Sequence, residues 1–371
     1  MGLMRRLRAN LRAARQIYQR LRDRGYGWLA VILWRLPQAA AVRGYRKLAY
    51  AINDGVLQRW VTPARFRRFQ SLIDDQLGGH FYVIVMPQTL HFVLPCLRLV
   101  VQEATVILLL NGVRQWEADL LRARFPNLAQ FRIATLPNSS VEHGSMINLL
   151  LRHNDRDFGL LDHDLYLFDK SVLRQLRFAD EEFLLCLLSD ASVDSKWIYP
   201  LTHFLYFRVA VFRRLMERYG VGAQSYRRVP EPARSRLAAL GLGDGETMKS
   251  YHDFFDTLHV LIGLAYADGL EVAQLEMVAE DGVYHIGGTS VGTHHTKDLA
   301  HLYIHLRFLE FADEPLLLRR YASVAAPFSS AAQVLRLVPA TTQALHRIRL
   351  VNALIDRLRS TLLSSKPAAR G

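Results

Sequence analysis

Four short apolar runs, each joined to the next by residues with helical spacing, constrain the fold of this chain more than any other feature. The apolar runs are residues 80–86, 105–110, 131–134 and 158–162. The linking residues with helical periodicity are 89–103, 114–124 and 142–153. This alternation of strand and helix predicts an α/β fold of Rossmann type, with a mainly parallel sheet and helices on its faces. Ligands of such sheets bind beyond the carboxyl ends of the strands.

Two aspartates stand at the carboxyl end of the fourth apolar run. The sequence there is Asp162-His163-Asp164, and the apolar residues 165–168 come directly after it. Two carboxylates inside an apolar stretch are costly to bury unpaired, and a bound divalent cation would offset that cost. Oxygen ligands favour Mg²⁺ or Mn²⁺, which keep coordination positions open for water and substrate phosphates. The alternative is an exposed turn with two solvated acids, but the position at a strand end favours the metal.

Basic residues are concentrated at the two ends of the chain. Residues 1–68 contain 16 Lys and Arg against 2 Asp and Glu, whereas residues 69–314 have a net charge of −9. Residues 315–371 contain 9 basic residues and a single acid, Asp356. We therefore expect a basic amphipathic helical region at 1–70, a folded core at 71–297 and a helical basic region at 298–371. Basic ends around an acidic core predict an anionic partner.

The first residues have the spacing of an amphipathic helix, because Leu3, Leu7 and Leu11 alternate with arginines. Such a helix is typical of membrane-surface or partner-binding elements. The apolar run 28–34 is far shorter than the ~20 residues that span a bilayer. It has Trp at both ends, so it predicts either an interfacial element or a segment packed on the core. A signal peptide is disfavoured by the long basic region. We expect a cytoplasmic protein, peripheral to the inner face of an anionic membrane.

The later residues predict a smaller set of elements. We expect a strand at 204–207, a helix at 209–219, a mobile loop or lid at 220–250 and an apolar helix at 252–268. Residues 275–278 and 283–285 predict short strands around the hairpin signal Asp281-Gly282. From about residue 298 onward we expect helices.

These features together resemble the GT-A fold of nucleotide-sugar glycosyltransferases over roughly residues 80–295. The resemblance rests on four strands that end in Asp162-x-Asp164, followed by a further strand, a helix and a late histidine before glycines. It implies a metal-dependent glycosyltransferase whose catalytic domain is residues 71–297. In this family the two aspartates hold Mn²⁺ or Mg²⁺ together with the diphosphate and ribose of the donor. A late histidine can supply another metal ligand in this family, and by position the resemblance implies that it is His285 here. The alternative is a histidine packed in the core.

The chain also departs from named branches of that family. It lacks a Gln-x-x-Arg-Trp signature after Asp164 and a Lys-Pro-Trp ending after the His-Gly stretch. The first strand ends in Pro87-Gln88-Thr89 instead of an acidic uracil-binding pattern. The subfamily, the donor nucleotide, and retention or inversion at the sugar carbon therefore stay open.

Further residues are candidates for the same site. Asp253 and Asp256, near the start of the helix expected at 252–268, are candidates for the base that takes the acceptor's proton. Their alternative role is to complement the helix dipole. Asn111, Asn148 and His294 are candidates, with Asp162, for binding the donor. For the two asparagines the alternative is the capping of turns and helices.

Three competing functions follow from other features. A nucleotidyltransferase would favour a loop rich in Gly, Arg and Lys after the first strand, and residues 87–91 do not form one. A nucleic-acid-binding or scaffold protein would need a basic folded face, which the acidic core argues against, so no nucleic-acid partner is expected. A zinc hydrolase is suggested by His301 and His305, four residues apart, but no Glu lies between them. The expected partners are a nucleotide-diphosphate sugar and a lipid-linked or cell-surface glycan acceptor.

Overall fold

A computed structural model describes residues 14–27, 31–191, 197–243, 254–278, 281–289 and 298–364. The chain divides into two compact units. The sheet unit consists of Ala49–Met86 and Leu99–His285. The terminal unit consists of Met1–Leu48, Pro87–Arg98 and Ile286–Gly371.

The sheet unit is built on a seven-stranded sheet of order β10-β6-β9-β4-β1-β2-β3. Its strands are β1 (Phe81–Val85), β2 (Val106–Leu110), β3 (Ala129–Arg132), β4 (Phe158–Asp162), β6 (Glu182–Cys186), β9 (Phe204–Phe207) and β10 (Glu271–Gln274). Strands β4, β1, β2 and β3 are parallel, and β10 is parallel to β6. Strand β9 runs antiparallel to both neighbours, β4 and β6. The prediction of an α/β fold with a mainly parallel sheet is confirmed.

Two pairs of short strands lie outside this sheet. Strands β5 (Leu165–Leu167) and β11 (Val283–His285) pair with each other, as do β7 (Ser189–Ala191) and β8 (Ile198–Pro200). The helices, in chain order, are η1 (Val31–Arg35), α3 (Leu36–Ile52), η2 (Asn53–Val61), α4 (Thr62–Leu72), η3 (Asp74–Gln76), α5 (Leu90–Val100), α6 (Gln115–Arg124), α7 (His143–His153), η4 (Lys170–Arg174), α8 (Val209–Tyr219), α9 (Glu231–Ala238), α10 (His259–Ala267), α11 (Leu299–Ala312), α12 (Pro315–Ala325), α13 (Ala331–Leu335) and α14 (Thr342–Ser364).

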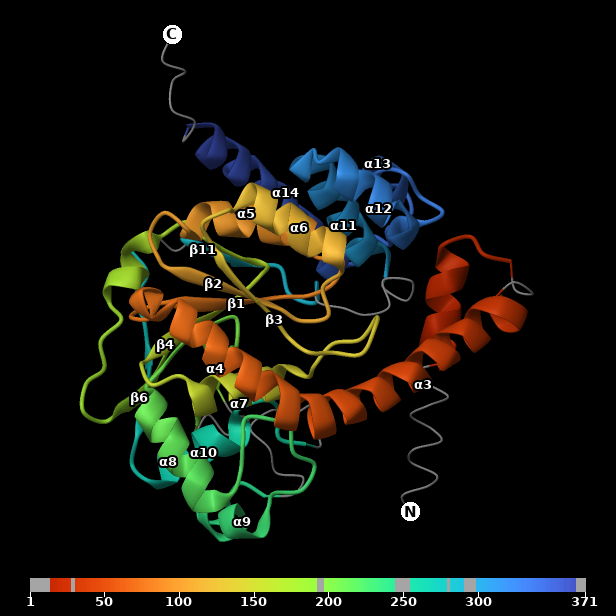
Figure 1. Ribbon diagram of the computed structural model, residues 1–371. Coiled ribbons are helices and arrows are strands. Elements are labelled where there is room, and N and C mark those ends of the chain that lie inside the picture. Colours follow the sequence, from red (N-terminus) through yellow and green to blue (C-terminus); the bar gives the residue numbers. More distant parts are fainter. Residues whose placement is uncertain are drawn as a thin grey trace. The chain divides into compact units, whose positions relative to one another are not determined.

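One face of the large sheet carries most of the core of the sheet unit. Successive strand residues point to opposite faces, so every second side chain of β1, β4 and β9 lies in the same core. The shared core includes Tyr82, Phe158 and Phe207 from these strands. It also includes the apolar faces of α7, α8 and α10, which Figure 1 shows on one side of the sheet together with α4. The strands are thus fixed on that face, and their carboxyl ends are held in place.

Gly159 allows β4 and β1 to pair closely at the centre of the sheet. Phe81 of β1 stands directly opposite Gly159 in the register. A Cβ atom on Gly159 would clash with the Phe81 ring. Both residues are buried, so the ring occupies the space that any other side chain at position 159 would need.

The terminal unit is helical in its described residues after 297, as expected. Helix α11 contacts α12, α13 and α14. Residues 14–23 are helical and agree with the amphipathic helix predicted there, while residues 1–13 of that prediction lie outside the described part of the chain. Among the described residues, no helix is both long enough and apolar enough to cross a membrane.

Three sequence predictions are wrong in the position or kind of the element. The region 220–250, predicted to be a loop, contains α9, which begins at Glu231-Pro232 because proline suits the first turn of a helix. Helix α10 begins at His259 and not at 252, because Phe255 exchanges two backbone hydrogen bonds with Tyr226. The third strand lies at 129–132, two residues before its predicted position.

The hairpin predicted around Asp281-Gly282 is also wrong. Residues 275–278 are not a strand, and β10 lies earlier, where it pairs with β6. Strand β11 pairs antiparallel with β5 instead. The carbonyl of Gly282 accepts hydrogen bonds from the backbone N–H groups of Phe168 and Asp169, which extends this pairing. The result brings His285 beside the residues that follow β4.

Candidate active site

Asp162 is the last residue of β4 and lies between two neighbouring strands. It stands opposite Ile84 of β1. On its other side, its backbone N–H donates a hydrogen bond of 2.9 Å to the carbonyl of His203, the residue before β9. Its side chain is 25% exposed, whereas that of Asp164 in the following turn is only 4% exposed. The carboxylates therefore sit at the carboxyl end of a central strand, as the sequence predicts.

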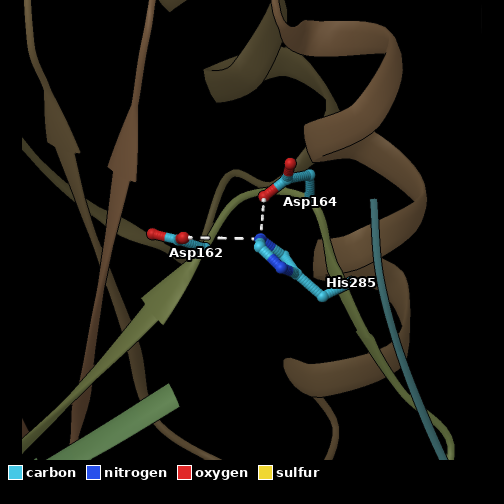
Figure 2. Close-up of side chains that lie close together, drawn as sticks. All are labelled: Asp162, Asp164 and His285. Carbon is cyan, nitrogen blue, oxygen red and sulfur yellow. Dashed lines mark ion pairs between the residues drawn. The ribbon is translucent and has the colours of Figure 1, made fainter. Parts of the chain in front are cut away.

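His285 completes a group with the two aspartates. In the β5–β11 pair His285 stands opposite Leu165, the residue after Asp164. Its Nε2 atom lies 3.4 Å from Oδ1 of Asp164 and 3.7 Å from Oδ2 of Asp162 (Figure 2). One ligand atom from each of the three residues lies within 4.8 Å of the others. Two carboxylates and an imidazole at these distances suit a divalent cation.

The charge state of His285 depends on the same two carboxylates. Burial lowers the pKa of His285, but hydrogen bonds to Asp162 and Asp164 and their charges outweigh this effect and raise the pKa to about 10. Without a bound cation, the ring is therefore protonated near neutral pH and balances the carboxylates. Only a neutral imidazole ligates a metal, so a cation that binds all three residues must displace this proton.

His203 supports the group in two ways that the sequence prediction missed. Its ring stacks on that of His285, with centroids 4.2 Å apart and planes 24° from parallel. Its carbonyl accepts the hydrogen bond from Asp162 described above, so one buried residue contacts both. Burial, followed by the charge of His285, lowers the pKa of His203 to about 4, and its ring stays neutral near pH 7. The sequence does show His203 just before the strand at 204–207. A prediction that this strand pairs with β4 would have brought His203 beside Asp162.

The start of α7 contributes further ionisable groups. Burial lowers the pKa of His143, against the opposing charges of Asp162 and Asp256. Burial raises the pKa of Glu142, and the charges of Asp54 and Asp256 raise it further. Asp256 and Asp162 thus act on the same imidazole, that of His143. The sequence analysis did not single out His143, Glu142 or Asp54.

The structure assigns other contacts to the two asparagines that were predicted to bind the donor. Asn111 is buried, and its side-chain amide both donates to and accepts from the backbone of Val141. Asn148 donates to Gln224 and accepts from the backbone N–H of Ala223. These bonds join neighbouring segments of the sheet unit, and a donor-binding role for either residue stays a prediction.

Of the two candidates for the base, Asp256 lies among the described residues and Asp253 does not. Asp256 precedes α10 by three residues and accepts a hydrogen bond from the backbone N–H of Thr257. The prediction that it opens the helix is therefore wrong, because the helix begins later. Asp253 and His294 lie outside the described residues, so their roles stay predictions.

His301 and His305 do not form the zinc pair considered from sequence. Nδ1 of His301 lies 2.9 Å from Oδ1 of Asp298, and the ring also contacts Arg347. His305 is buried in the terminal unit, where its ring meets that of His91 edge-on. The group of Asp162, Asp164 and His285 is the one set of potential metal ligands found in the described part of the chain.

Comparison with known proteins agrees with the resemblance to glycosyltransferases. The profile of the family described as StrH glycosyltransferase N-terminal domain matches residues 58–212. This segment includes Asp162, Asp164 and His203 but ends before His285. The match confirms that the chain resembles glycosyltransferases. No curated protein sequence matches the chain.

Among solved structures, the crystal structure of S. aureus TarS residues 1–349 is similar to this chain at 12% sequence identity. The similarity covers 75% of this chain and 83% of that one, with a TM-score of 0.29. A TM-score this low carries no weight, so the fold rests on the strand order and pairing given above.

Proposed function

We propose that this protein is a metal-dependent glycosyltransferase with a GT-A-like core. It transfers a sugar, of hexose type, from a nucleotide-diphosphate sugar to a lipid-linked or cell-surface glycan acceptor. The observation that carries the proposal is the group of Asp162, Asp164 and His285, whose ligand atoms lie within 4.8 Å at the end of β4. It stands at the carboxyl edge of a mainly parallel sheet, where such folds bind their ligands.

The three residues of this group would hold Mn²⁺ or Mg²⁺. When bound, the ion stabilises the negative charge that grows on the departing diphosphate. Asp162 and Asp164 supply the anionic ligands, and the fixed backbone of β4 orients them before substrate arrives. His285 would contribute a neutral nitrogen, which requires that its proton first be lost to the solvent. His203, stacked on His285, limits the rotation of that ring.

A carboxylate base that accepts the proton of the acceptor hydroxyl completes the proposed reaction, if the sugar carbon is inverted. Asp253 and Asp256 are the candidates. Asp256 is supported by its electrostatic action on His143, which also experiences the charge of Asp162. Either carboxylate must lie within hydrogen-bond reach of the acceptor, so substitution by Asn would lower the rate and leave metal affinity unchanged.

The acceptor is proposed to lie at the cytoplasmic face of a membrane. The support is the charge distribution, with 16 basic residues against 2 acids in residues 1–68. Basic residues near an anionic surface contribute about 1 kcal/mol each, falling off within a Debye length. Deletion of residues 1–24 should therefore move the protein from the membrane fraction toward the soluble one, and high salt should have the same effect.

A thermal-shift panel of nucleoside diphosphates, with and without Mn²⁺, tests the function. We expect at least one nucleoside diphosphate to raise the melting temperature in the presence of Mn²⁺ and to lose this effect in EDTA, because the ion joins phosphate to the carboxylates. Asp164→Asn should abolish the Mn²⁺-dependent part. If no nucleoside diphosphate shifts the wild-type protein with Mn²⁺ present, the proposal is wrong.

A further inference from the structure

The helix formed by η2 and α4 in the sheet unit has one face that is fully used. Thr62, Phe66 and Gln70 are buried, at intervals of four residues. The Phe66 ring packs on Phe131 of β3, with centroids 5.0 Å apart, and Gln70 donates a hydrogen bond to Asn154. Figure 1 shows α4 lying along the sheet. Since this face meets the core, the opposite face should be polar if it only met water.

That opposite face instead carries a line of Val56, Trp60, Ala64 and Leu72, interrupted by Arg68. Four residues make slightly more than one turn of an α-helix such as α4 and slightly less than one turn of the wider π-helix η2. The exposed residues 56, 60, 64, 68 and 72 therefore lie on nearly the same side. Val56 is 51% exposed, Trp60 70% and Leu72 76%. We name residues 56, 60, 64, 68 and 72 the outer stripe. Single exposed apolar side chains are ordinary, but a line of them that includes a tryptophan marks an interaction surface.

Arginine is the only charged residue type in residues 55–73, which contain the outer stripe. Arg68 belongs to the stripe, and Arg59, Arg65 and Arg67 flank it, all of them exposed. No Asp or Glu occurs in residues 55–73. The guanidinium of Arg59 lies over the Trp60 ring, 5.5 Å from its centroid. The face thus combines four positive charges with large apolar groups.

We propose that the outer stripe binds the surface of an anionic lipid bilayer. Tryptophan favours the headgroup level, valine and leucine enter the acyl boundary, and arginine extends its guanidinium to lipid phosphates while its stem stays apolar. A nucleic acid would match the arginines but leave Val56 and Leu72 in water. The inference deepens the membrane location included in the proposed function, by naming a surface within the folded sheet unit and not in the basic N-terminal residues.

The test measures binding of the full chain to vesicles. Sedimentation is followed with vesicles of neutral phosphatidylcholine and with vesicles containing anionic phosphatidylglycerol, at low and high salt. We expect the wild-type protein to bind the anionic vesicles. The variant R59Q/R67Q/R68Q should lower the partition coefficient at least about tenfold, because each arginine near the surface contributes. Trp60→Ser should also lower binding, and this loss should persist at high salt because it is not electrostatic.

A matched control separates the outer stripe from net charge. The variant R122Q/R124Q/R214Q removes three exposed arginines elsewhere in the sheet unit and changes net charge by the same amount. Thermal melts of each variant check folding, since surface substitutions of this kind cost little stability. Control binding equal to wild type, with lost binding in the stripe variant, supports the proposal. Equal losses in both triple variants overturn it, because net charge alone then explains the binding.

Other results overturn the lipid assignment outright. If the wild-type chain binds no vesicle of either composition, the stripe does not bind lipid. If it self-associates with rising concentration, and the stripe variant abolishes this without any vesicle binding, the occupant is a second copy of the chain. The thermal-shift panel with nucleoside diphosphates and Mn²⁺ runs on the same samples. A protein that binds vesicles through the stripe but no nucleotide would contradict the proposed function and leave this inference standing.

Discussion

Each unit of this protein contains two histidine rings in contact, and their surroundings differ. In the sheet unit His203 and His285 stack with centroids 4.2 Å apart, and His285 approaches two carboxylates. In the terminal unit His91 and His305 meet edge-on at 4.3 Å, and the Tyr321 ring packs at 5.6 Å from His91. The first pair belongs to a potential metal site and the second to an aromatic core. Neighbouring carboxylates, and not the closeness of two histidines, therefore distinguish a potential metal site from aromatic packing.

The largest expected effect concerns the carboxylates themselves. Asp164→Asn should lower turnover on the order of 100-fold or more, because it removes ligand charge from a cation that contributes several kcal/mol to transition-state stabilisation. The melting temperature measured in EDTA should fall by a few degrees at most, because the pairing with protonated His285 weakens but no core volume is lost. Steady-state kinetics at saturating Mn²⁺ check the rate.

Asp157→Asn is the matched control for Asp164→Asn. Asp157 precedes the other end of β4 and accepts a hydrogen bond from the backbone N–H of Val209, which an amide oxygen can also accept. The activity of the Asp157→Asn variant should stay near that of the wild-type protein. If Asp164→Asn instead keeps wild-type turnover, the carboxylates beside His285 do not serve catalysis. They would then no longer distinguish the His203–His285 pair from the His91–His305 pair.

The second prediction compares the two pairs directly. His285→Ala should raise the Mn²⁺ concentration for half-maximal activity about tenfold or more, because a ligand is lost. His305→Ala should leave that concentration unchanged and lower the free energy of unfolding by about 2 kcal/mol or more, because it empties part of a buried core. Direct Mn²⁺ titration by electron paramagnetic resonance and thermal melts of both variants measure the two quantities. If His305→Ala instead weakened Mn²⁺ binding and His285→Ala only lowered stability, the metal site would belong to the His91–His305 pair.

The third prediction concerns the support that His203 gives to His285. His203→Phe keeps an aromatic face against the His285 ring, so Mn²⁺ affinity should stay within about twofold of wild type. His203→Ala removes the stack and should weaken Mn²⁺ binding about tenfold, the range typical of residues that orient metal ligands. Mn²⁺ affinity is measured without substrate. If both variants bind Mn²⁺ as wild type does, the ring of His203 has no positioning role.

The smallest expected effect is a pH dependence of stability in EDTA. The pKa of His285 is about 10 in the folded protein and ordinarily 6.5. A raised pKa contributes stability that is fully present below pH 6.5 and is lost as the pH rises toward 10. The melting temperature of wild type minus that of His285→Gln should therefore fall by a few degrees, roughly, between pH 6 and pH 10. With Mn²⁺ the difference should grow with pH instead, since cation binding needs the deprotonated ring. A difference that does not change with pH in EDTA would contradict the assigned protonation of His285.

Local sequence signals were enough to predict the strands that deliver the aspartates. An apolar run such as 158–161 has few options besides a buried strand, and the carboxylates follow it directly. His203 could not be predicted because its role depends on β9 running antiparallel beside β4, a pairing between residues about 40 positions apart. The strand that carries His285 was predicted, but with the wrong partner, because the turn signal at 281–282 favours a local hairpin. Its proposed role as a ligand came from the family resemblance alone.

Gly159 has a consequence for how mutations act on this protein. It lies three residues before Asp162 on the same strand, and its missing side chain makes room for the Phe81 ring. Any larger residue there must move either the ring or the strand, and a moved strand displaces the carboxylates at its end. A genetic screen for inactive variants should therefore return changes at position 159, which carries no functional group. The mutational tolerance of the potential metal site is in this way set partly by the interior of the sheet.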